Sequence, residues 1–113
     1  MILVVDTSVA VKWYVAEAKH EKAKHLLFTN IALLAPDLLW SETANVLRRK
    51  VRMGEMGQEQ AVEGVRSLAI AIHGFIPSSD LVEHAMDLSA TLNHSVYDCI
   101  YLAAALASDD RCL

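Results

Sequence analysis

The sequence has no apolar run long enough to cross a membrane: residues 2–5 and 102–107 fall well short of the about 18 residues that a spanning helix needs. No repeat, linker or low-complexity segment interrupts the 113 residues, and 54% of them are hydrophobic, which excludes a disordered chain. An apolar run begins directly after Met1, so we expect no signal peptide. These features predict a single domain over residues 1–113 with a core of its own.

Cysteine and positive charge are also scarce. Cys99 and Cys112 have neither zinc-site nor CxxC spacing, so we interpret them as reduced thiols of a cytoplasmic protein. The net charge of −4 disfavours a basic surface that grips nucleic acid nonspecifically. It leaves open a nuclease whose acidic site is neutralised by bound divalent cations. An acidic surface also suits a basic protein partner.

The apolar run at residues 2–5 stops at a carboxylate, Asp6. Such a run predicts a strand buried on both faces, as in a parallel sheet. Asp6 then lies at the carboxyl end of the strand, which is where open α/β sheets bind ligands. Either Thr7 or Ser8 is expected to cap the helix that follows.

Further strands are predicted at residues 31–35, closed by Pro36, and at 75–76. Helices are expected over residues 9–15, 17–30, 37–52, 58–71, 81–92 and 96–107. Strands that alternate with helices predict an α/β fold with a parallel sheet.

The helix predicted over residues 37–52 begins near Pro36 and Asp37. Its helical spacing gives one apolar stripe of Trp40, Ala44, Leu47 and Val51. On the opposite side the same spacing places Glu42, Asn45 and Arg49. In the helix over residues 81–92, capped by Ser79 or Asp80, the apolar stripe is Leu81, Ala85, Leu88 and Leu92.

Three carboxylates have candidate chemical roles, and each also has a purely structural interpretation. Asp6 closes a buried strand, which is costly unless the carboxylate is paired, hydrogen-bonded or metal-bound, and capping the next helix is one such role. Glu42, taken alone, fits an exposed helix glutamate. Asp98 follows Ser95 in a Ser-x-x-Asp pattern that is a near relative of the capping box. Composition and spacing leave these alternatives open.

The motifs ILVVDTSVAVKW, LLWSETANVLRR and HSVYDCIYLAAA occur in this order along nearly the whole chain. Together they resemble the PIN domain, and within it the VapC-like toxins of VapBC toxin–antitoxin pairs. The resemblance implies a three-layer α/β/α sandwich with a parallel sheet. It also implies an endoribonuclease that depends on Mg2+ or Mn2+, which are cations that favour oxygen ligands.

Carried over by position, the resemblance makes Asp6, Glu42 and Asp98 the catalytic acids, with Asp6 and Asp98 as metal ligands. Ser8 and Asn45 match polar neighbours that support the same pocket. Arg49 is a candidate phosphate contact because it shares the side of the helix that holds Glu42. Tyr97 and Tyr101 are interpreted as packing residues.

The resemblance also implies an RNA substrate, a VapB-like antitoxin that covers the acidic pocket, and a homodimer. One departure is that the family usually continues with a strand ending in a fourth acid, whereas this sequence stops at Cys112 and Leu113. We expect a shortened last strand. Asp109 or Asp110 is a candidate substitute for the missing acid, but a place in the preceding turn is the favoured interpretation of both. The alternative is a catalytically impaired PIN-fold interaction module. A response-regulator receiver is disfavoured because no acidic pair follows the first strand.

Overall fold

The computed structural model describes residues 2–13 and 31–108. The helix predicted over residues 17–30 and the predicted roles of Asp109 and Asp110 lie outside the described residues. None of the described helices has both the length and the hydropathy that crossing a bilayer requires. In chain order the elements are β1 (Ile2–Val4), α1 (Thr7–Lys12), β2 (Ala32–Pro36), α3 (Leu38–Arg52), α4 (Gln58–Arg66), α5 (Leu68–Ala71), β3 (Gly74–Ile76), a 3-10 turn (Ser78–Asp80), α6 (Val82–Leu92) and α7 (Val96–Ser108).

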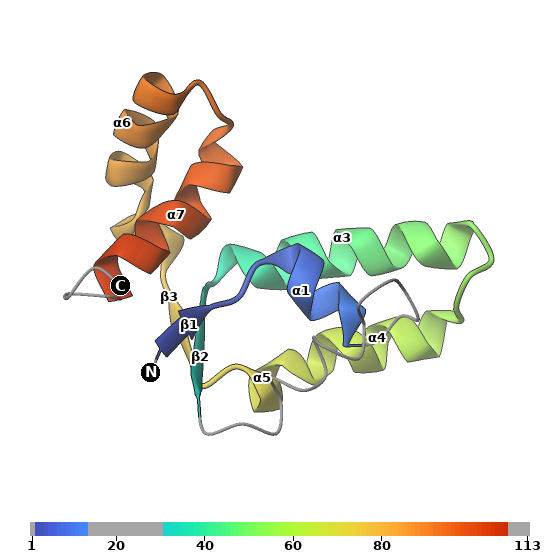
Figure 1. Cartoon of the computed structure of the whole chain (residues 1–113). Helices are drawn as coiled ribbons and strands as arrows, with labels where there is room; N and C mark the ends of the chain where they lie inside the picture. The colour runs from blue at the N-terminus through green and yellow to red at the C-terminus, as the bar shows by residue number, and fades with distance from the viewer. Residues whose placement is uncertain (1, 14–30, 109–113) are drawn as a thin grey trace.

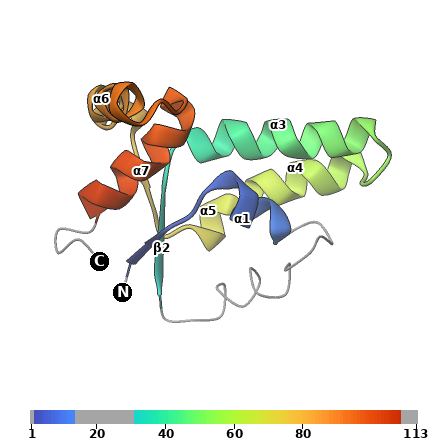
Figure 2. The same cartoon turned by 45° about the horizontal axis from the view of Figure 1, so that its top comes forward.

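The three described strands form one parallel sheet in the order β1-β2-β3. Leu3 pairs with Leu33 in the register of β1 and β2, and both pack into a core with α1, α3 and α5. The next residue of β1, Val4, packs instead with α6 and α7. This alternation follows from the two-residue period of a strand. It puts helices on both faces of the sheet, as Figures 1 and 2 show, and confirms the predicted α/β sandwich.

Two separate clusters of buried residues fill the space on the two sides of the sheet. The first joins the sheet to α1, α3 and α5 through Val5, Ala10, Trp13, Leu33, Ala35, Leu39, Leu68 and Ile72. The second is built from α6 and α7 with Leu81, Ala85, Cys99, Ile100, Ala103 and Ala104. Each helical layer therefore has its own apolar contact with the sheet.

The strand that ends near Asp6 is less buried than the sequence predicts. Ile2 is 38% exposed, and among the described strands only β2 pairs with β1. Helices cover β1 on both faces, as expected, but β1 is an edge strand of the described sheet, and its first residue is therefore partly open to solvent. Pro36 ends β2 in register with Ile76, so it is a strand residue and does not begin the following helix.

The buried line of α3 is rotated from the predicted stripe. Leu39, Thr43 and Leu47 are the buried residues, spaced four apart, whereas Trp40 and Ala44 are only partly buried. The predicted stripe does face inward in part, because Leu47 is buried and Trp40 packs against the first core cluster, but Leu39 and Thr43 were not predicted to be buried. The exact inward direction is decided by packing, because α3 contacts α1, α4 and β2 at once.

The segment over residues 58–71 forms two helices, α4 and α5, where the sequence predicts one. The break falls at Ser67, whose hydroxyl donates to the carbonyl oxygen of Gly64 at 2.8 Å. Serine side chains compete for helix carbonyls in this way, which explains a break without a glycine or proline.

The start of α6 also differs from prediction. Neither Ser79 nor Asp80 caps it: both lie in the 3-10 turn, and Leu81 occupies the cap position without a side-chain hydrogen bond. The backbone N–H of Ser78 donates instead to the Asp37 carboxylate, at 3.0 Å. Asp37 thus joins the start of α3 to the end of β3. Leu92, predicted to be buried, is 45% exposed near the end of α6.

β2 is the central strand of the described sheet, so we expect a substitution in its buried side chains to destabilise the fold. Leu33 is 1% exposed, whereas Ile70 on α5 is 87% exposed. Leu33→Ala should lower the free energy of unfolding by about 2–5 kcal/mol, because it removes buried methyl groups and leaves a cavity. Ile70→Ala, the control, should change it by less than about 0.5 kcal/mol. Urea denaturation followed by circular dichroism measures both, and equal effects would contradict this packing.

Candidate active site

The three predicted acids line one pocket, although they are far apart in the sequence. The pocket has a volume of about 490 Å³ and lies where the end of β1 meets α1, α3 and α7. Its described lining consists of Asp6, Thr7, Ser8, Glu42, Asp98 and Tyr101. The parallel sheet therefore presents this polar pocket at the carboxyl end of β1, which is where such folds bind ligands.

Asp6 is positioned by the helix that follows it. Its carboxylate oxygen Oδ1 accepts the backbone N–H of Val9 at 3.1 Å and the hydroxyl of Ser8 at 2.7 Å. Asp6 is thus the N-cap of α1, and the prediction that Thr7 or Ser8 caps this helix was wrong. Oδ1 accepts both hydrogen bonds. The second carboxylate oxygen of this exposed side chain, Oδ2, is therefore not used in capping.

Glu42, one turn into α3, is half-buried and anchored by two hydroxyl groups. Its Oε1 accepts hydrogen bonds from Thr7 Oγ1 at 3.1 Å and from the hydroxyl of Tyr101 at 2.5 Å. These donors come from α1 and α7. Glu42 is therefore not the ordinary exposed helix glutamate of the structural interpretation.

Tyr101 packs against the first core cluster, as predicted, and it also lines the pocket, which the sequence did not predict. Burial, followed by the hydrogen bond to Glu42, raises the pKa of the Tyr101 hydroxyl well above its ordinary value, so the group stays a neutral donor. The available signal was its spacing: Tyr101 is three residues after Asp98, so both face the same side of α7. Thr7, also missed, directly follows Asp6. Tyr97, the other predicted packing residue, is 62% exposed.

Asp98 lies in the first turn of α7. Its backbone N–H donates to the Ser95 hydroxyl at 3.1 Å, which confirms the predicted cap at this helix start. The side chain of Asp98 is exposed and lines the pocket. Asp98 thus contributes its backbone N–H to the helix cap and its side chain to the pocket.

Two predicted residues are not part of the described pocket lining. Asn45 and Arg49 are exposed on α3, one and two turns beyond Glu42. Ser8, by contrast, lines the pocket and contacts Asp6. The predicted neighbours are therefore divided between the pocket and the adjoining helix surface.

The donor atoms of this pocket are carboxylate and hydroxyl oxygens, the ligands that Mg2+ and Mn2+ favour. Among residues 2–13 and 31–108, however, no three acidic, histidine or cysteine side chains come close enough to hold a metal ion. The chemistry of the donors thus fits a hard cation, with fewer than three direct carboxylate ligands from the described residues.

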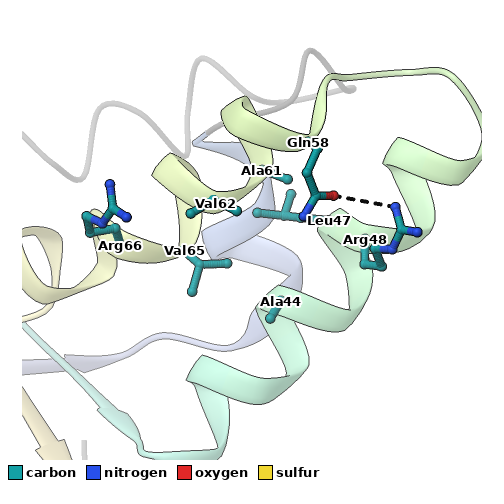
Figure 3. Close-up of a pocket in the computed structure, with 8 residues that line it drawn as sticks. All are labelled: Ala44, Leu47, Arg48, Gln58, Ala61, Val62, Val65 and Arg66. Atoms are coloured by element: carbon teal, nitrogen blue, oxygen red, sulfur yellow. Dashed lines mark hydrogen bonds between the residues drawn. The ribbon is translucent and has the colours of Figure 1, made fainter.

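A second pocket of about 500 Å³ lies between α3 and α4 (Figure 3). Its floor is apolar, with Ala44, Leu47, Ala61, Val62 and Val65. At the rim Arg48 donates to Gln58 at 3.4 Å, and Arg66 also lines the pocket. No carboxylate is among its described lining residues, so the acidic pocket is the better candidate for catalysis.

Comparison with known proteins identifies the family. The family model described as the PIN domain matches residues 3–113. Ribonuclease VapC3 of Pyrobaculum aerophilum is 29% identical to the chain over 110 residues, which covers 93% of this chain and 82% of that protein. Because the family model matches almost the whole chain, and the parallel sheet with its flanking helices agrees with it, the protein belongs to the PIN-domain family.

Proposed function

We propose that the protein is an endoribonuclease that hydrolyses RNA phosphodiester bonds with the help of Mg2+ or Mn2+. The observation that carries the proposal is the meeting of Asp6, Glu42 and Asp98 in one pocket of a PIN-domain chain. The relative named Ribonuclease VapC3 supports RNA as the substrate. We further propose that the protein acts as the toxin of a toxin–antitoxin pair.

In this proposal Asp6 and Asp98 hold the cation, and Glu42 orients water. Mg2+ keeps several of its waters in protein sites, so one or two direct carboxylate ligands suffice. Once bound, the ion would polarise a phosphoryl oxygen and help to generate hydroxide. Asp6 is suited to its role because its cap bonds use Oδ1 alone. Ser8 supports Asp6 through its hydroxyl, and Asn45 is proposed as a polar neighbour on α3.

A basic antitoxin that reaches into the acidic pocket is the proposed regulator. The support is the net charge of −4 together with three carboxylates at the pocket. A positive side chain placed there would compete with the cation for the same oxygens. A homodimer is proposed on family resemblance.

The alternative function is a PIN-fold interaction module without activity. It is favoured by one observation, that no three side chains of the described residues are arranged to hold a metal ion. A parent protein that neither binds a divalent cation nor cleaves RNA, yet still binds its partner, would support the module over the enzyme.

Substitution of Asp6 separates its cap from its proposed catalytic role. Asparagine caps helices as well as aspartate does, so Asp6→Asn should preserve the melting temperature. It should lower cleavage of a fluorogenic single-stranded RNA by about 100-fold or more, because a cation ligand is lost. Asp98→Asn should behave alike. Asp87→Asn, at an exposed position of α6, is the control. Full activity in Asp6→Asn would overturn the assignment.

Divalent cations should stabilise the folded protein. A ligand that binds only the folded state raises its stability, by about 2.7 kcal/mol at 100 times its Kd. Scanning calorimetry should therefore show a melting temperature several degrees higher in excess Mn2+ or Mg2+ than in EDTA. The double variant Asp6→Asn/Asp98→Asn should show no such rise. An equal rise in that variant would place the cation elsewhere.

Arg49 is proposed to contact an RNA phosphate beyond the cleaved bond, because it is exposed on α3 two turns after Glu42. Arg49→Gln should raise KM and leave kcat unchanged, since the contact serves binding alone. The salt dependence of log kcat/KM should weaken by roughly 0.7 in slope. Arg66→Gln on α4 is the matched control and should change neither value. A loss confined to kcat would contradict the proposed role.

A further inference from the structure

Both hydrogen bonds that anchor Glu42 end on the same oxygen. Thr7 Oγ1 and the Tyr101 hydroxyl each donate to Oε1, and these two hydroxyl oxygens are themselves 3.1 Å apart. Thr7 on α1 is 35 residues from Glu42 on α3 in the sequence, and Tyr101 on α7 is 59 residues from it. This contact ties together the three helices that surround the pocket.

The arrangement has a direct consequence for the carboxylate. A glutamate side chain on a helix surface samples several rotamers, and two donors on one oxygen restrict that freedom. With Oε1 engaged by both hydroxyls, Oε2 is the oxygen left to accept a proton or a hydrogen bond from water. A carboxylate that is already oriented costs less to order when the reaction occurs.

We propose that Thr7 and Tyr101 are positioning residues that hold the Glu42 carboxylate in the orientation needed to act on water. The inference rests on the proposed nuclease function and goes beyond it, because that proposal assigns no role to either residue. Tyr101 acts through Glu42 and does not itself touch the reacting atoms. Thr7 contributes the second donor and contacts the Tyr101 hydroxyl.

The first test removes each hydroxyl at nearly constant shape. Tyr101→Phe and Thr7→Val should each lower kcat for a fluorogenic single-stranded RNA by about tenfold, with KM within about twofold, since second-layer partners of an active group typically contribute 10–100-fold. Thr7→Ser keeps a hydroxyl and should retain parental kcat. Tyr97→Phe, at an exposed tyrosine one turn earlier on α7, is the matched control. Parental kcat in both Tyr101→Phe and Thr7→Val overturns the inference.

The second test does not require activity. In the parent, the Tyr101 hydroxyl proton should give a slowly exchanging NMR resonance because it is hydrogen-bonded, and Glu42→Gln should shift that resonance. An unchanged resonance in Glu42→Gln overturns the positioning role even if the parent cleaves RNA. A parent that cleaves no RNA with Mg2+ or Mn2+ overturns the proposed function instead. The two failures are therefore distinguishable.

Discussion

The placement of three carboxylates around one pocket is the constraint on which the site of this protein depends. Asp6, Glu42 and Asp98 line this pocket, and each has a local group that stabilises its negative charge. Asp6 accepts the N–H of Val9 at the start of α1. Asp98 occupies the first turn of α7, where the helix dipole favours negative charge. Glu42 accepts hydrogen bonds from two hydroxyl groups. In the proposed enzyme, a bound cation would stabilise these carboxylates further.

The sheet makes the meeting of these acids possible. Side chains alternate along β1, so Leu3 packs with α1, α3 and α5 while Val4 packs with α6 and α7. The strand thus holds one helical layer on each face. Asp6 follows directly at its end, where α1, α3 and α7 converge on the pocket. The packing of these two apolar clusters against the sheet therefore also places the residues of the site.

Several parts of the fold could be predicted from local signals. The apolar runs identified the strands. Gly54 lies in the turn directly after α3 with a positive φ of 76°, a conformation that glycine adopts readily. Ser95 caps α7 as its spacing predicts. These features depend on residues only a few positions apart, so they can be predicted from the sequence without knowing the tertiary structure. The burial of Leu39 and Thr43 on α3 could not be predicted in this way, because it is decided by contacts with three other elements.

The sequence by itself determined which three acids are candidates for the site and the helix starts near which Asp6 and Asp98 lie. Only the tertiary structure decided that Tyr101 and Thr7 share one oxygen of Glu42. The physical reason is range: a cap is closed within one helical turn, whereas the bond between Tyr101 and Glu42 spans 59 residues. It forms only when α7 and α3 are packed on the same end of the sheet.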